Sequence, residues 1–254
     1  PFATWDFSIG RTAAGDVIYL MPGHAETTTA IALDVAGVKT IGLGFGRNRP
    51  TITSTAVATD LVDVTAANCE IHNIRLVGAA SACTALLDSS AAATDLVLKK
   101  CSFEQAATPV NGLTLSGARF LIEDCQFSGS ADGPDVAIEL EAGCDGFIIR
   151  RVDFLYPSGL DVAIIRAQNQ AQLAYLIDDI FAVGLDTLLV SMASSSAGPP
   201  DGLFASGRVM MSAAVTSIED IVAAGTTKGM AFGRVYATDA TGLAGGLVPL
   251  TTAS

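Results

Sequence analysis

Aromatic residues and charges are scarce in this sequence. Only 6% of its residues are aromatic, one is tryptophan, and 16% are charged. The chain therefore offers few flat apolar rings on which a sugar could stack. Its 14 basic residues against 26 acidic ones give a net charge of −12. Nucleic-acid binding needs clustered Lys and Arg, so this balance argues against a nucleic-acid partner.

Long apolar runs are also absent, although half of the residues are apolar and the mean hydropathy is +0.47. The uncharged stretches are interrupted by Ala, Gly, Ser and Thr, so we expect no membrane span. No basic segment followed by an apolar one stands at the start, and we therefore expect no secretory signal there.

The cysteines lack the spacing of a metal site. There is no CxxC pair, no set of cysteines and histidines with the spacing of zinc ligands, and the number of cysteines is odd. We expect neither a zinc site nor a disulfide framework, and no cofactor of another kind. Two of them occupy the same repeat position and are expected to be small buried hydrophobic residues. The five are Cys69, Cys83, Cys101, Cys125 and Cys144, and the repeat pair is Cys101 and Cys125.

A six-residue phrase recurs through the first three quarters of the chain. Its copies begin 33, 27, 24, 27 and 28 residues apart, a period typical of one coil of a stacked solenoid. The first, fourth and sixth positions are mostly apolar and the second and fifth mostly polar. The copies are residues 38–43, 71–76, 98–103, 122–127, 149–154 and 177–182.

A second, weaker repeat lies between these phrases and keeps step with them. Each period therefore holds at least two short strands, separated by segments too short and too rich in Gly, Ser and Asp for a crossover helix. This pattern predicts a β-solenoid, in which equivalent strands of successive coils pair in parallel. The second repeat comprises residues 62–64, 85–87, 113–115, 138–140, 163–165 and 188–190.

The N-terminal segment carries the most specific signal. Residues 16–24 (DVIYLMPGH), 37–44 (GVKTIGLG) and 49–53 (RPTIT) follow one another. This order resembles the entry of right-handed parallel β-helices of the pectin-lyase-like superfamily, over residues 15–54. The resemblance implies an all-β fold, a right-handed parallel β-helix of about 6–8 coils. We expect one domain, with a cap at 1–14, the β-helix at 15–192, and degenerate coils with a tail at 193–254.

The cap segment contains Trp5, with Phe2 and Phe7 nearby. A solenoid must cover its end, because open strand edges template aggregation. We expect Trp5 to plug the first coil; the alternative is a contact with a partner.

Charged residues occupy the outward positions of the six-residue phrase. From Lys99 onward the second position alternates in sign, which favours ion pairs between neighbouring coils. If the chain were an enzyme, its best candidate cluster would be Asp153, Asp178 and Asp179 beside Arg150. The resemblance to the pectin-lyase-like superfamily implies two kinds of active site. Its lyases use clustered acidic residues with an arginine, and its hydrolases use two or three close aspartates. Neither motif can be placed here residue by residue, so we expect surface ion pairs and no enzyme.

Aromatic residues fall mainly on one inward position of the phrase. Phe103, Phe127 and Phe154 share it and are expected to stack within the core. Tyr156 and Phe181 are expected to be exposed, and two aromatic residues would make a poor sugar groove.

The second repeat suggests a contact face. Its middle positions are Asp63, Leu86, Thr114, Glu139, Ile164 and Leu189. Three of these are large and aliphatic, so Leu86, Ile164 and Leu189, together with Trp5, are candidates for burial against another subunit. A register slip of one residue would instead turn the aliphatic side chains inward.

Three functions remain open. The preferred hypothesis is a non-catalytic virion protein, because the N-terminal pattern is similar to that of bacteriophage β-helices. It would be a capsid decoration or head-spike protein on the virion surface, bound to other virion proteins such as the capsid protein. A homo-oligomer, in one form a trimer, fits this role. The alternatives are a polysaccharide lyase or hydrolase of the phage depolymerase kind and a bacterial surface adhesin.

Overall fold

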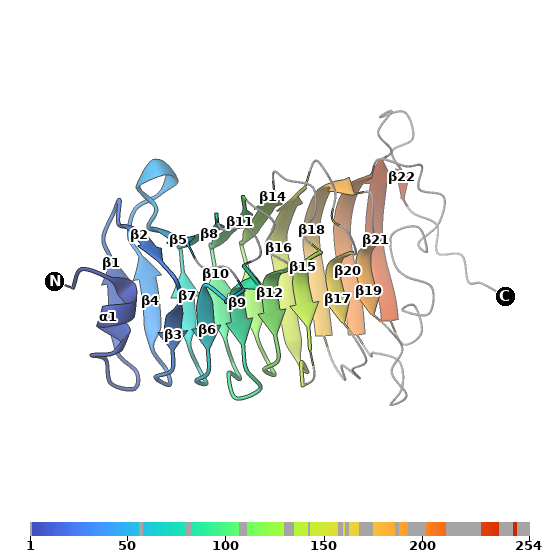
Figure 1. The fold of residues 1–254 in the computed structure, drawn as a ribbon. Coiled ribbons are helices and arrows are strands. Elements are labelled where there is room, and N and C mark those ends of the chain that lie inside the picture. Colours follow the sequence, from blue (N-terminus) through green and yellow to red (C-terminus); the bar gives the residue numbers. More distant parts are fainter. Residues whose placement is uncertain are drawn as a thin grey trace.

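The computed structural model shows an all-β solenoid built almost entirely of parallel strands (Figure 1). It describes residues 2–55, 58–79, 83–106, 111–129, 135–141, 143–156, 160, 163–167, 175–185, 188–192, 202–211, 230–238 and 246–247. The predicted fold class is confirmed.

Short strands stack along one axis and form three faces. The first face contains β1 (Val17–Leu20), β4 (Lys39–Gly42), β7 (Glu70–His72), β10 (Val97–Lys99) and β13 (Leu121–Glu123). The second contains β2 (Ala25–Thr28), β5 (Thr51–Ser54), β8 (Arg75–Gly78), β11 (Ser102–Gln105) and β14 (Gln126–Gly129). The third contains β3 (Ile31–Leu33), β6 (Val62–Val64), β9 (Ala85–Ser89), β12 (Asn111–Leu115), β15 (Val136–Leu140), β17 (Ala163–Ala167) and β19 (Leu188–Met192).

The first two faces merge in the later coils. β16 pairs with β13 through its first half and with β14 through its second half, and longer strands continue the ladder from there. The last short strand is antiparallel to its neighbour. These strands are β16 (Phe147–Leu155), β18 (Tyr175–Leu185), β20 (Gly202–Met211), β21 (Met230–Thr238) and β22 (Gly246–Leu247).

The six-residue phrase is two strands joined by a one-residue corner. Its third residue has a left-handed backbone, with φ near +55°. In three of the copies the N–H of this residue bonds to a carbonyl of the next coil: Asn73 to Lys99 at 2.9 Å, Lys100 to Glu123 at 3.0 Å and Asp124 to Arg150 at 3.3 Å. The corner therefore turns the chain without breaking the ladder. Its members are Asn73, Lys100, Asp124, Arg151 and Asp179.

In the first copy of the phrase, residues 38–43, the alignment expected from the sequence differs by two residues from the strand register of the structure. Thr40, and not Val38, pairs with Ile71, so Lys39 lies beside Glu70. Lys39 Nζ is 2.8 Å from Glu70 Oε2, which gives this first pair of coils its own ion pair.

A second corner column precedes the first face. Glycine is common there, because φ is positive and glycine carries no Cβ penalty. Gly37 N–H bonds to Ala67 O at 2.9 Å and Asn68 N–H to Thr94 O at 2.8 Å, so this column also connects successive coils. The column comprises Gly15, Gly37, Asn68, Asp95, Arg119 and Gly146.

Two aromatic stacks run through the core. The predicted one is confirmed, with ring centroids 4.7 Å apart for Phe103 and Phe127 and 5.1 Å apart for Phe127 and Phe154. A second joins Phe147 to Phe120 at 4.9 Å and to Tyr175 at 5.3 Å. Stacked rings repeat at the strand spacing, so each coil positions the ring of the next.

Tyr156 is buried, so the expectation of an exposed tyrosine was wrong. It lies two residues beyond Phe154 and is buried like it, and its hydroxyl donates a hydrogen bond to Gln105 Oε1. All five cysteines are free and buried, and the burial of Cys101 and Cys125 is as predicted. Burial raises the pKa of the Cys144 thiol to about 12, which leaves it protonated and unreactive.

The first coil is closed by the helix α1 (Trp5–Ile9), whose N-cap is Thr4. Trp5 has no exposed surface; its indole N–H bonds to Thr40 Oγ1 at 3.1 Å and its backbone N–H to Glu26 Oε2 at 2.7 Å. Trp5 therefore fills the end of the core and is not available to a partner. A short 3-10 helix, Gly46–Asn48, lies in the loop before β5.

Candidate functional site

The outward polar residues gather on both sides of the corner at Asn73, where the first face meets the second. On the first face, strand register aligns His72, Lys99, Glu123, Arg150 and Asp178. On the second face it aligns Arg75, Ser102, Gln126, Asp153 and Phe181. This is the surface on which the sequence placed its candidate catalytic residues.

Glu123 is the centre of this surface. Its carboxylate is 3.1 Å from Lys99 Nζ, accepts a hydrogen bond of 2.6 Å from Arg150 Nε, and also pairs with Arg151. Only 6% of the residue is exposed. Burial by itself raises the pKa of Glu123, but the hydrogen bonds from Lys99, Arg151 and Arg150 outweigh burial and lower the pKa to about 2. Glu123 is therefore ionised and cannot donate a proton near neutral pH.

The arginine of the candidate cluster is occupied by this carboxylate. Arg150 pairs with Glu123, and the neighbouring Arg151 bonds to Asp124 through Nε at 2.6 Å. The hydrogen bonds that Arg151 donates to Asp124 and Glu123 raise its pKa further. Both guanidinium groups thus serve as structural cations, in keeping with the predicted ion pairs between coils.

The three candidate aspartates divide between the two sides of the corner. Asp178 follows Arg150 in the first-face row and accepts a hydrogen bond of 2.8 Å from Ser206 Oγ. Asp179 is the corner residue, and its N–H donates to the same Ser206 oxygen at 3.1 Å. Asp153 lies on the second face; burial and then the charge of Asp179 raise its pKa. The charge of Asp179 therefore acts on Asp153, whereas Asp178 is held by Ser206.

The third face does not carry the expected aliphatic surface. Leu87, and not Ala85, pairs with Leu113, so the alignment expected from the sequence is wrong by two residues at this strand. The same shift occurs where Ile165, and not Ala163, pairs with Ile138. Leu86 and Ile164 are fully buried and cannot contact a subunit, and that expectation was wrong. The side chain of Leu189 lies outside the described residues. Among the described side chains, the true outward row is polar and consists of Asp63, Asp88, Thr114, Glu139 and Arg166.

Acidic residues crowd at one end of this row, a feature that the sequence reasoning missed. Asp88 lies directly beside Asp63 on the next coil. Burial, followed by the charges of Asp60, Asp63 and Glu141, raises the pKa of Asp88 to about 6. Further along, Arg166 pairs with Glu139 and neutralises it. Correct register would have revealed the cluster, because Asp63 and Asp88 then fall side by side.

Within the described part of the chain, no three His, Cys, Asp or Glu side chains are grouped so as to hold a metal ion. No helix among the described residues has the length and hydropathy of a membrane span.

The comparisons with known proteins reach the fold alone. No family model matches the chain, and no curated protein matches it. Among solved structures, it is similar to a crystal structure of pectin methylesterase in complex with a hexasaccharide. That likeness has a TM-score of 0.57 at 12% identity and covers 95% of this chain and 80% of the other. The β-helix fold of that structure is therefore shared, and at this identity no activity is carried over.

Proposed function

We propose that this chain is a non-catalytic structural protein of a bacteriophage virion, a capsid decoration or head-spike protein. One observation carries the proposal: on the first face, the charged side chains of the row from Lys99 to Arg150 are bonded to one another between coils. Glu123 joins Lys99, Arg150 and Arg151 across three successive coils. Such a lattice stiffens the solenoid and leaves those groups without a free acid or base.

We also propose that the partners are the capsid protein and further copies of this chain, on the virion surface. A rigid rod whose surface charges are paired is suited to attachment.

The test is mass spectrometry and antibody labelling of purified native particles. Label at regular positions on capsids is the expected result. Protein recovered free of every particle, with no label on capsid or tail, would rule out the virion role.

A second candidate is a polysaccharide-degrading enzyme, favoured by Asp153. Its pKa is raised by burial and by the charge of Asp179, and a general acid requires a carboxyl pKa raised towards the working pH. The fold is also shared with pectin methylesterase. The assay follows reducing ends, unsaturated products and methanol released from pectin and other acidic polysaccharides. Activity lost in Asp153→Asn and Asp179→Asn, but kept in Glu104→Gln, would favour this enzyme over the structural role.

A further inference from the structure

The exposed large hydrophobic side chains are concentrated at the N-terminal end of the solenoid. Among the residues whose exposure the structure describes, all large hydrophobic residues that are exposed lie within the first 45 positions. A solvated surface tolerates scattered apolar residues, but a cluster of this kind is typical of a contact site. The side chains and their exposed fractions are Phe2 58%, Phe7 51%, Val17 46%, Tyr19 58%, Met21 63% and Phe45 86%.

This end also carries an open strand edge. β1 pairs with β4 on one side and, among the described strands, with none on the other. Lys39 N–H bonds to Asp16 O at 3.0 Å and Leu43 N–H to Leu20 O at 2.8 Å, so the even-numbered residues face β4. Residues of a parallel strand alternate between its two neighbours, and Val17 and Tyr19 therefore direct their N–H and C=O groups to the open edge.

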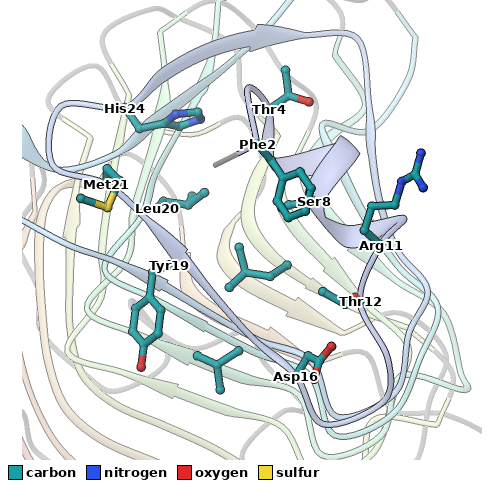
Figure 2. A pocket seen from close by; sticks show the side chains of 12 residues that line it. Phe2, Thr4, Ser8, Arg11, Thr12, Asp16, Tyr19, Leu20, Met21 and His24 are labelled. Atoms are coloured by element: carbon teal, nitrogen blue, oxygen red, sulfur yellow. The ribbon is translucent and has the colours of Figure 1, made fainter.

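The cap covers the other parts of the end better than it covers β1. Asp6 Oδ1 accepts the N–H of Ala32 on β3 at 3.4 Å, and Trp5 fills the core. Between α1 and β1 a cavity of about 440 Å³ remains. Figure 2 shows Phe2 on the α1 side of this cavity and Tyr19 on the β1 side.

Electrostatics allow a second copy to approach at this end. Residues 1–49 contain four basic and four acidic side chains, whereas the whole chain carries −12. The full net charge therefore belongs to residues 50–254, and lateral contact between copies would meet repulsion that end-to-end contact avoids. The eight residues are Arg11, Lys39, Arg47, Arg49, Asp6, Asp16, Glu26 and Asp34.

We propose that the N-terminal end docks a second copy of this chain, with β1 of one copy antiparallel to β1 of the other. Two identical edges run antiparallel about a two-fold axis, so the contact is self-complementary and closed. The free N–H and C=O groups of Val17 and Tyr19 would form its ladder. The exposed apolar side chains of the two first coils would cover one another. This inference goes beyond the proposed virion role and is independent of it.

The test compares molecular mass over a range of protein concentrations by size-exclusion chromatography with light scattering. The chain has a mass of 25.9 kDa, and a dimer of twice that mass is expected. Tyr19→Pro removes one edge N–H that β4 does not use, so the fold tolerates it while the new ladder does not. Val17→Lys places a charge at the contact. Each variant should weaken dimerisation at least tenfold.

Val97→Lys is the matched control. Val97 lies in the same outward row as Val17, but on β10, which is paired on both sides. The Val97→Lys variant should therefore dimerise like the parent chain. Circular dichroism establishes that each variant is folded. Hydrogen exchange gives a second readout, because the amides of Val17 and Tyr19 should exchange more slowly as the dimer forms.

A chain that stays monomeric at the highest concentration contradicts the proposal, including when this end instead captures a different protein from native particles. Dimers that survive both Tyr19→Pro and Val17→Lys, or that only Val97→Lys disrupts, place the contact elsewhere and also overturn it.

Discussion

The hydroxyl of Tyr156 donates a hydrogen bond to Oε1 of Gln105, and Gly129 occupies the coil between them. Both Tyr156 and Gln105 are buried. A Cβ on Gly129 would lie 2.9 Å from Cδ1 and Cε1 of the tyrosine ring, well inside van der Waals contact. The absence of a side chain on one coil is thus what lets residues of the two flanking coils meet.

Gly129→Ala should lower the free energy of unfolding by about 1–3 kcal/mol, because the ring cannot move away without losing its bond to Gln105. Urea denaturation followed by circular dichroism measures the effect. Gly10→Ala is the control, since the nearest atom to its Cβ is 3.8 Å away, and it should change stability little. Equal stabilities of Gly129→Ala and the parent would show that the tyrosine yields freely.

Glu123 should make stability depend on acid pH. Its pKa falls from an ordinary 4.5 to about 2 on folding, so its contribution is present above pH 4.5 and is lost as pH falls towards 2. Glu123→Gln should lower stability at pH 7 by about 1–2 kcal/mol and flatten the profile between these values. Urea midpoints from pH 2 to 7 measure this. Glu104→Gln, which loses a more exposed pair with Arg75, should change the midpoints less.

Asp88 should act in the opposite direction. Its pKa rises from 3.8 to about 6 on folding, so its ionisation reduces stability as pH rises through 6 and has no effect below 3.8. Asp88→Asn should therefore stabilise the chain at pH 7.5, by on the order of 1 kcal/mol after solvent screening, and leave it unchanged at pH 3.5. Thermal midpoints at the two pH values report this. A carboxyl carbon titration of Asp88 centred near pH 4 would argue against the cause.

Replacing Lys100 by glycine should stabilise the folded chain. It is an exposed corner residue with φ of 55°, a conformation that costs a residue with a Cβ about 1 kcal/mol and glycine nothing. Lys100→Gly is expected to raise the melting temperature by a few degrees. Lys99→Gly, one residue earlier and within a strand, should lower it. If both substitutions lower it, corner strain does not limit stability.

The inward half of the fold could be predicted from the sequence. Phe103, Phe127 and Phe154 recur at one position because a solenoid core repeats its side chains at every coil, and hydropathy alone reveals that. The corners were not predictable in the same way. Asn73, Lys100 and Arg151 share a backbone conformation and little chemistry, so no single residue type marks it.

Register was the harder problem on the outward faces. A slip of two residues keeps the same alternation along the strand, so the period of the pattern alone left Leu86 and Asp88 as alternative neighbours of Asp63. The candidate site suffered from the same ambiguity. The charges of the first-face row were predicted to pair, but the role of Glu123 as the common partner of three cations depends on side-chain reach and burial, which spacing does not encode.

The corner columns have a consequence for the length of the molecule. Because corner residues of both columns, such as Gly37 and Asn73, donate their N–H groups to the coil that follows, successive coils are joined in the same way. Duplication or loss of one coil, roughly 27 residues in the gene, would lengthen or shorten the rod by a single strand spacing of about 4.8 Å. The length of the rod can therefore change during evolution in steps of one coil.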